Sequence, residues 1–182
     1  MPAAAPAAVS SSPPAQKPLP TPDTAKSELR RTLGRFATGV AVIAAPGREG
    51  PVGLLVNSFT SVSLDPPTVL FCIAATSRTW PHIERSGVFA ASFLRQEQRE
   101  AAQRFSRVDT DRFAGIPTVT AATGAPVLAE SLGYVDCRVR EVLRRDDHHL
   151  ILGEVLEARA LSAGRPLLFF DGSWNRVLEP AP

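Results

Sequence analysis

The sequence has only two cysteines, and no stretch of it approaches 18 consecutive apolar residues. Cys72 and Cys137 lie far apart in apolar surroundings, so each is expected to be a small buried side chain and not a metal ligand. A membrane-spanning helix needs about 20 mostly apolar residues, and a signal peptide needs a basic region before an apolar one. Because the chain shows neither pattern, we expect a cytoplasmic protein without a membrane span.

Lysine is nearly absent, and the net charge is small. The 20 basic residues are 18 arginines and two lysines, and the net charge is +2. Nucleic-acid binding needs a clustered basic face. The nearest cluster, Arg138 to Arg145, is interrupted by Glu141 and follows a strand-like pattern. We therefore expect a solvated strand face at this position, with nucleic-acid binding as the weaker alternative.

Several familiar site motifs are also missing. No glycine-rich nucleotide motif follows a strand, because Gly47, Gly50 and Gly53 have the wrong spacing. No Ser-His-Asp or Cys-His order occurs, and the adjacent His148 and His149 have no further histidine or cysteine beside them. We expect no metal site, and any nucleotide cofactor must be held by something other than a Rossmann turn.

Proline is concentrated at the N-terminus, where residues 1–22 contain seven of the 17 prolines. Alanine and serine fill most of the rest of this segment, a composition that cannot bury a core. The sequence therefore predicts a disordered tail over residues 1–23, followed by one domain over residues 24–182.

The hydrophobic pattern of this domain favours strands over helices. A helix is predicted to begin near Asp23 or Thr24, to carry the apolar stripe Leu29, Leu33 and Phe36, and to end at Gly39. A short helix closing at Gly87 and an amphipathic helix through 95–105 are also expected, and 107–125 reads as a loop. The predicted strands are 40–46, 52–56, 68–74, 88–94, 135–140, 150–158 and 167–170. Helices do not alternate regularly with strands, so we predict a mainly β protein, an antiparallel barrel with peripheral helices.

Short polar side chains fill the connection between the predicted strands 52–56 and 68–74. The segment contains Asn57, Ser58, Thr60 and Ser61 but no glycine, although a plain hairpin would use Asn-Gly or Asp-Gly. Such amide and hydroxyl groups are suited to the polar edge of a flat ligand, with apolar neighbours covering its face. The alternative is that they hydrogen-bond within their own turn.

Two further polar groups are candidates for binding. Ser77, Arg78 and Thr79 follow a predicted strand and precede a predicted helix, where hydroxyls, a guanidinium and backbone amides are suited to a phosphate. An ordinary capped helix with a surface arginine is the alternative. Asp147 and His148 precede another strand, and a histidine beside a carboxylate is suited to binding or protonating a substrate. The alternative here is a polar hairpin tip.

Taken together and in this order, the segments resemble the flavin reductase family of the split-barrel fold, the small NAD(P)H:flavin oxidoreductases that serve two-component monooxygenases. The resemblance covers about residues 29–177. It is carried by "GRFATGVAVIAA", "NSFTSVSLDPPTVLFCI", "SRTWPHIERSGVFAASFL", "DRFAG", "DDHHLILGEV" and "RPLLFFDGSW". The hydroxyl-rich segment that ends in Ser-Leu-Asp-Pro-Pro is the most diagnostic.

The resemblance implies an antiparallel Greek-key split β-barrel, a homodimer with the flavin near the subunit interface, and hydride transfer from NADH or NADPH to FMN or FAD. Reduced flavin would then pass to a separate monooxygenase. His148 would be the candidate catalytic residue, docking the nicotinamide. The flavin phosphate would be held by Ser77, Arg78 and Thr79, and the rest of the flavin by the segment of Asn57, Ser58, Thr60 and Ser61, with Thr38 and Gly39 nearby.

The chain departs from the family pattern at three places. Asp146 stands where glycine usually precedes Asp-His, Ala91-Ser92 stands where Val-Asn is common, and Trp174 replaces a frequent tyrosine. Three alternatives to a diffusible-flavin reductase also stay open. They are a flavin-retaining enzyme that acts on an organic substrate, a non-catalytic flavin or haem binder, and a dimerisation module without a cofactor.

Overall fold

The computed structural model describes residues 21–108 and 110–177, so nearly all of the predicted tail lies outside the described residues. The chain divides into two compact units, residues 1–33 and 34–182. The described part of the first unit is helix α1 (Pro22–Leu33), in which Glu28 and Arg31 form an ion pair one turn apart. The second unit contains α2 (Trp80–Ser86), the short 3₁₀ helix η1 (Gln96–Gln98) and α3 (Arg99–Ser106). No helix in the described residues has the length and apolar character that crossing a bilayer requires.

The first predicted helix is shorter than the sequence suggested. It ends at Leu33, directly before Gly34, and not at Gly39. Glycine disfavours helix propagation, and Thr38 and Gly39 instead form β1, which pairs with β11. Phe36 therefore lies outside the helix, and its side chain is 74% exposed.

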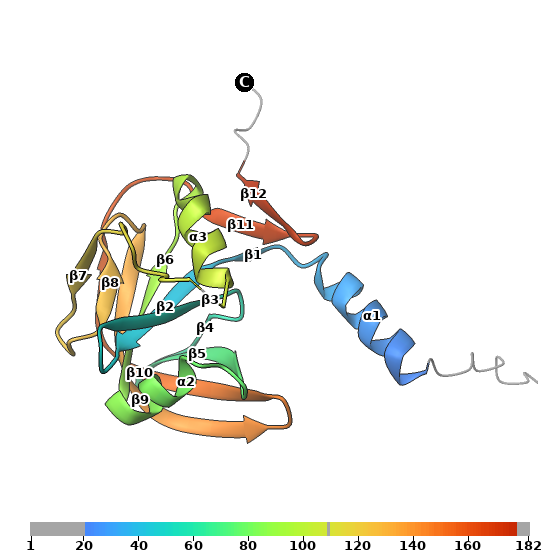
Figure 1. Ribbon diagram of the computed structural model, residues 1–182, viewed down its shortest axis with the longest axis horizontal. Coiled ribbons are helices and arrows are strands. Elements are labelled where there is room, and N and C mark those ends of the chain that lie inside the picture. Colours follow the sequence, from blue (N-terminus) through green and yellow to red (C-terminus); the bar gives the residue numbers. More distant parts are fainter. Residues whose placement is uncertain (1–20, 109, 178–182) are drawn as a thin grey trace, which may run out of the picture. The chain divides into compact units, whose positions relative to one another are not determined.

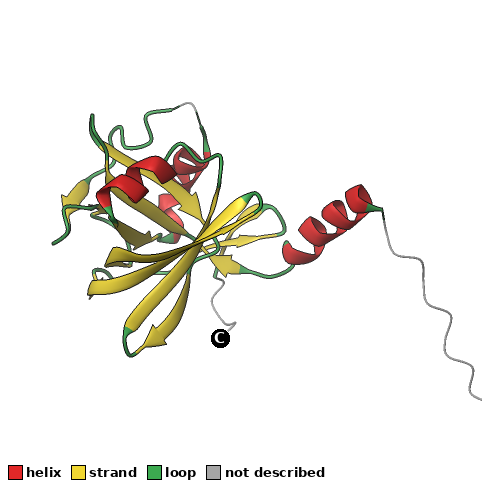
Figure 2. Ribbon diagram, turned by 90° about the horizontal axis from the view of Figure 1, so that it is seen from below, coloured by secondary structure: helices red, strands yellow, loops and turns green. Residues whose placement is uncertain are grey.

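The second unit is built from antiparallel strands (Figures 1 and 2), which confirms the mainly β prediction. A seven-stranded sheet has the order β3-β2-β6-β9-β10-β5-β4, a three-stranded sheet has the order β1-β11-β12, and β7 pairs with β8. The strands are β1 (Thr38–Gly39), β2 (Ala41–Pro46), β3 (Pro51–Val56), β4 (Thr60–Leu64), β5 (Pro67–Ala74), β6 (Val88–Phe93), β7 (Thr118–Thr120), β8 (Pro126–Leu128), β9 (Gly133–Arg145), β10 (His148–Ala160), β11 (Leu167–Phe170) and β12 (Ser173–Arg176).

The large sheet curls around a single apolar core. Side chains of β2 near one end of the strand order and of β5 near the other belong to the same buried cluster. Phe71 of β5 packs edge-on against Phe89 of β6 with ring centroids 5.0 Å apart, and both side chains are fully buried. Strand β3 also contacts β5 directly, so the two ends of the sheet approach one another.

Strand β2 is buried on both faces. Ala41, Ile43 and Ala45 face the core inside the curled sheet, whereas Val42 and Ala44 pack in a second cluster together with Phe105 of α3. A strand covered on both sides reads as a continuous apolar run, which explains why "VAVIAAP" was recognised in the sequence.

The connection between the predicted strands 52–56 and 68–74 is itself partly a strand. Residues Thr60–Leu64 form the edge strand β4, antiparallel to β5, with a register shift between Ser61 and Ser63. The region 107–125, predicted as a loop, also contains the short strand β7. Both were missed for the same reason: most of their residues are exposed, so they lack the apolar face that identifies a strand.

Candidate functional site

Ser58 fixes the polar segment to the middle of the large sheet. Its hydroxyl accepts a hydrogen bond from the amide of Cys72 at 2.9 Å and donates to the carbonyl of the same residue at 3.3 Å. Strand β4 begins only at Thr60, which pairs with Leu70, so no backbone of β4 lies opposite Cys72. The side chain of Ser58 therefore supplies the two hydrogen bonds that a strand backbone would otherwise make to Cys72. Ser58 therefore bonds a neighbouring strand and not its own turn, whereas Thr60 and Ser63 bond within the segment, to the carbonyl of Ser61 at 3.3 Å and to the backbone of Asp65 at 3.0 and 3.1 Å.

A cavity of about 510 Å³ lies beside this segment. It brings together five of the predicted site residues: Thr38, Gly39, Asn57, Ser58 and Thr60. The remaining wall is largely apolar and comes from Phe36, Phe59, Phe93, Leu94, Leu132, Pro166 and Leu167, among others. Ser61 does not line this cavity, because it is exposed on the edge strand β4.

The cavity fits a flat ring with a polar edge. Phe59 and Phe93 lie 5.4 Å apart and form an aromatic surface. The hydroxyl oxygen of Thr38 is buried, with no hydrogen-bond partner among the described residues. Buried hydroxyls are normally paired, so this atom is suited to a hydrogen bond with a ligand.

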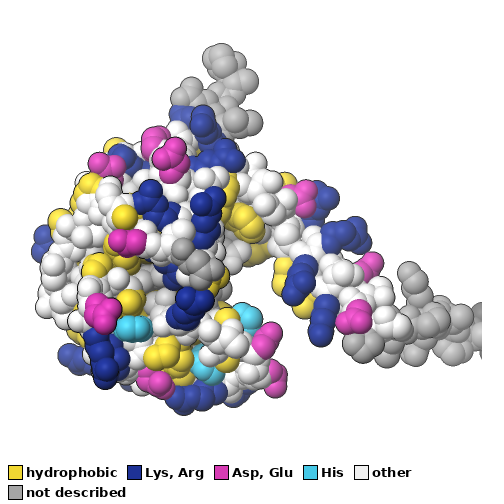
Figure 3. All heavy atoms as spheres, viewed as in Figure 1, with side chains coloured by type: hydrophobic (Ala, Val, Ile, Leu, Met, Phe, Trp, Pro, Cys, Tyr) yellow, Lys and Arg dark blue, Asp and Glu magenta, His cyan; other side chains and the backbone are white. Residues whose placement is uncertain are grey.

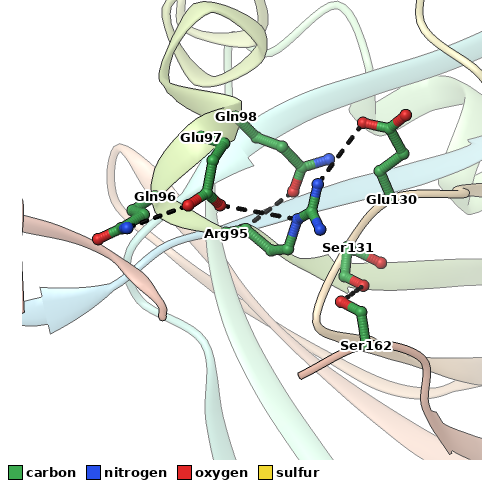
Figure 4. Close-up of polar contacts among 7 residues, drawn as sticks. All are labelled: Arg95, Gln96, Glu97, Gln98, Glu130, Ser131 and Ser162. Atoms are coloured by element: carbon green, nitrogen blue, oxygen red, sulfur yellow. Dashed lines mark hydrogen bonds and ion pairs between the residues drawn. The ribbon is translucent and has the colours of Figure 1, made fainter. Parts of the chain in front are cut away.

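One wall of the cavity is held by a polar cluster around Arg95 (Figure 4). The guanidinium forms ion pairs with Glu97 at 3.8 Å and Glu130 at 3.7 Å, and the backbone amide of Arg95 donates to the side chain of Gln98 at 2.9 Å. The pKa of Glu97 lies below its ordinary value, because its own backbone amide and then the side chain of Gln96 donate to the carboxylate. The cluster joins η1 to the loop that carries Leu132 into the cavity wall.

Replacing Arg95 with methionine removes both ion pairs and keeps the aliphatic stem. The guanidinium is partly exposed, so each pair is worth only a fraction of a kcal/mol, and we expect a total loss of about 1 kcal/mol. The melting temperature should fall by roughly 2–4 °C, measured by thermal unfolding at low salt. At 1 M salt the difference should shrink, because exposed charges are screened. The exposed Arg99→Met serves as the control, and an equal fall in that variant would contradict the assignment.

A second cavity, of about 270 Å³, lies at the other end of β3. Arg78 and Thr79 line it together with Arg112, which the sequence reasoning did not select. The Arg112 guanidinium donates to the carbonyl of Gly53 and, at 3.3 Å, to the hydroxyl of Thr79. Gly53 and Asn57 are four residues apart on an extended chain, about 13 Å, so the two cavities are separated by roughly that length.

The two arginines place positive charge at this second cavity. The pKa of Arg112 is lowered from its ordinary value, first because the group is partly buried and second because the charge of Arg78 is close to it. Two guanidinium groups held near one another favour a bound anion between them. On the face drawn in Figure 3, basic and acidic side chains are interspersed.

Arg112 reaches the site because of local packing. Phe113 stacks edge-on against Phe105 of α3 with ring centroids 4.9 Å apart, and Arg112 also donates to the carbonyl of Arg107 at 2.8 Å. The only signal in the sequence is "DRFAG", one of the segments that carry the family resemblance, which falls in the region predicted as a loop.

The backbone around Ser77 is used within its own turn. The amide of Ser77 donates to the carbonyl of Ala74, the amide of Thr79 to the hydroxyl of Ser77, and the amide of Trp80 to the carbonyl of Ser77. These amides are therefore not directed to a ligand, contrary to the predicted phosphate cradle of free amides. An anion at this position would depend on side chains, and Thr79 is only 3% exposed.

His148 lies at the tip of the β9–β10 hairpin and lines neither cavity. Its ring nitrogen Nδ1 is 2.9 Å from a carboxylate oxygen of Asp147. The backbone of His148 pairs with Ala74 of β5. The next amide, of Ala75, donates to the carbonyl of Asp147 at 2.9 Å. The hairpin tip is therefore tied to the strand end that leads into Ser77.

The three departures from the family pattern occupy different environments. Asp146 has φ of 32°, a conformation that glycine adopts without penalty, at the first position of the two-residue hairpin turn. Ala91 and Ser92 are fully buried, and the Ser92 hydroxyl accepts the amide of Leu128, so both belong to the core. Trp174 packs on Phe169 and lines a cavity of about 330 Å³ that Asn57 also borders.

The described residues contain no group of three or more histidine, cysteine, aspartate or glutamate side chains placed to hold a metal ion.

Comparison with known proteins identifies the fold family. A family model described as a flavin reductase like domain matches residues 33–177. The chain belongs to the flavin reductase family. Members of this family are oxidoreductases, so the protein is an enzyme of that class.

Individual relatives agree with this family assignment. The reductase subunit HsaB of a flavin-dependent monooxygenase from Rhodococcus jostii is 41% identical over 152 residues, which are 84% of this chain and 77% of HsaB. A flavin reductase from Pseudomonas putida is 36% identical, over 81% of this chain and 87% of its own.

Solved structures of related proteins share the fold of this chain. Nitrilotriacetate monooxygenase component B from Mycobacterium thermoresistibile has a TM-score of 0.83 at 36% identity, covering 89% of this chain and 94% of its own. The NADH:FAD oxidoreductase SgcE6 from Streptomyces globisporus, solved with NAD and FAD fragments, has a TM-score of 0.82 at 34% identity, covering 91% of this chain and all of its own.

Proposed function

We propose that the protein reduces FMN or FAD with NADH or NADPH and supplies the reduced flavin to a separate monooxygenase component. The observation that carries the proposal is the pair of cavities joined by β3, one with a polar edge on an aromatic wall and one with two arginines. A flavin has the same two parts, a flat ring system and a phosphate, connected by a flexible chain. The names of the relatives, among them reductase subunits of flavin-dependent monooxygenases, support the same activity.

In this proposal each residue binds or orients, and none transfers a proton. Asn57, Thr60 and the unpaired hydroxyl of Thr38 would meet the polar edge of the ring, with Gly39 beside them. Ser58 would set the position of Asn57 through its bonds to Cys72. Ser61, which lies outside the cavity, would contribute only through the placement of Thr60 beside it.

At the phosphate end, Arg78 and Arg112 would supply charge, while Thr79 and Ser77 would hold the two arginines in place. Hydride transfer from a nicotinamide to a flavin is chemistry that the two molecules supply between themselves, so the protein contributes proximity and orientation.

The activity can be tested directly. The purified protein is mixed anaerobically with FMN or FAD in catalytic excess and with NADH or NADPH, and the visible absorbance of the flavin is followed. Bleaching of the whole flavin pool would support a reductase that releases its product and would identify the preferred reductant. Bleaching of only one equivalent would overturn the proposal in favour of a flavin-retaining enzyme. Bound flavin without bleaching would overturn it in favour of a binder.

Replacing His148 with alanine should raise the KM for NAD(P)H by about tenfold and leave flavin affinity within about twofold. The tip of the hairpin is tied to the strand end near Ser77 and lies outside both cavities, so in the proposal His148 would contact the nicotinamide and not the flavin. A lost charge-assisted or aromatic contact is worth about 1–2 kcal/mol. Steady-state kinetics and flavin titration separate the two parameters, and if neither moves, the role of His148 fails.

The same proposal includes a homodimer in the cytoplasm. Strand β4 is an edge of the large sheet and exposes Val62 and Leu64, 52% and 89% exposed, as an apolar strip that a second copy would cover. Sedimentation at several protein concentrations tests the dimer. Val62→Lys should yield a monomer, and an unchanged molar mass in that variant would exclude this strip as the interface.

A further inference from the structure

The second cavity does not end at the two arginines. It continues into a third cavity of about 670 Å³, and the two share five lining residues: Pro51, Val52, His82, Asp111 and Phe113. We call the combined space the β3 groove. Its near end is formed by Arg78 and Arg112, and its far end by the turn that carries Arg48 and Glu49. The third cavity is well within the size range of small-molecule sites, about 300–1,000 Å³.

FMN ends at its phosphate, so an FMN bound as proposed above would leave the groove beyond Arg78 and Arg112 unused. FAD carries a second phosphate, a ribose and an adenine at that point. The groove offers a group for each part: a further guanidinium at Arg48, a carboxylate at Asp111 and the ring of His82 beside the apolar side chain of Val52.

Two side chains of this groove, Asp111 and His82, are held by contacts within the protein. One oxygen of the Asp111 carboxylate accepts the amide of Phe113 at 3.1 Å. The Nδ1 atom of His82 lies 3.1 Å from a guanidinium nitrogen of Arg85, a contact that holds the ring in place. The ring also lies against the turn at Gly47, where an added Cβ would come within 3.4 Å of it. A ring fixed in this way is suited to stacking on a base.

We infer that the β3 groove holds the adenosine phosphate half of FAD, so that this enzyme takes FAD in preference to FMN. The inference rests on the proposed function, since it assumes that the phosphate next to the flavin lies between Arg78 and Arg112. The inference adds a preference for FAD over FMN and assigns this preference to Arg48 and His82.

The test compares two dissociation constants in one protein. Quenching of flavin fluorescence gives the Kd of FMN and of FAD for the wild type and for Arg48→Ala, His82→Ala and the control Arg99→Ala. We expect the wild type to bind FAD at least about tenfold more tightly than FMN, the effect of one charge-assisted contact. In Arg48→Ala and His82→Ala the ratio should fall toward one, and in Arg99→Ala it should stay at the wild-type value.

The other outcomes overturn the inference in recognisable ways. Equal affinities for FMN and FAD in the wild type mean that the adenosine half stays outside the groove. A groove variant with an unchanged FAD-to-FMN ratio but a raised KM for NADH, measured with FMN, means that the groove belongs to the adenosine of the reductant. Binding of neither flavin refutes the proposed function itself, a result distinct from the first two.

Discussion

Replacing Arg112 with alanine should raise the Kd of FMN by about 10- to 100-fold. In the proposed site Arg112 faces the flavin phosphate together with Arg78, and a hydrogen bond between charged groups is worth about 1.5–3 kcal/mol. Arg112→Lys should recover part of the loss, because it restores the charge but not the guanidinium, whose Nη1 donates to Gly53 and Thr79 and whose Nε donates to Arg107. Flavin fluorescence titration measures the Kd of FMN for the wild type and for both variants.

Riboflavin provides the control for this experiment, because it lacks the phosphate. Arg112→Ala should change the affinity for riboflavin by no more than about twofold. If FMN and riboflavin weaken together, then Arg112 acts only by supporting Gly53 and Thr79, and the phosphate assignment is wrong. Arg112 would then be a structural residue that joins the loop after α3 to the large sheet.

Replacing Gly53 with valine should destabilise the protein by about 3 kcal/mol. A Cβ at this position would lie 3.0 Å from the carbonyl oxygen of Ile43 and 3.1 Å from ring carbons of Phe105 and Phe113. Gly53 is buried between β2 and the aromatic pair, so a branched side chain has no room without shifting one of them. For a domain of this size the melting temperature should fall by roughly 6–12 °C.

The matched control is Gly39→Ala. No heavy atom lies within 4 Å of the Cβ that this substitution would add, so the melting temperature should stay within about 2 °C of the wild type. Equal stability of Gly53→Val and the wild type would mean that Phe105 and Phe113 can move apart at little cost. The position of Arg112, which follows from that aromatic pair, would then be loosely fixed as well.

Sequence reasoning succeeded where burial leaves a periodic pattern. Strands β2, β5 and β6 contribute to the core. They could be predicted from their apolar runs because at least one face of each strand is buried. The polar segment at Asn57 was singled out for the opposite reason, since short polar side chains between two buried strands contradict the pattern of their neighbours. In the structure, residues of this polar segment line a cavity.

The misses came from contacts that no local pattern encodes. Strand β4 is an edge strand with Val62 and Leu64 exposed, so neither face signals burial. Arg112 is distant in sequence from Arg78, and the packing of Phe113 on Phe105 brings the two together. The amides near Ser77 were expected to be free because a helix begins there, whereas the turn that precedes α2 uses them, with the carbonyl of Ala74 and the hydroxyl and carbonyl of Ser77 as acceptors.

The hydroxyl of Ser58 completes the hydrogen bonding of Cys72 at the point where β4 has not yet begun. This has a consequence for how related sequences are interpreted. Position 58 must carry a short side chain that both donates and accepts, whether or not any ligand is bound, because otherwise a core strand loses two hydrogen bonds. A descendant of this protein that no longer bound flavin would therefore retain the serine. Asn57, whose proposed role is to meet the ligand, would be free to vary in such a descendant.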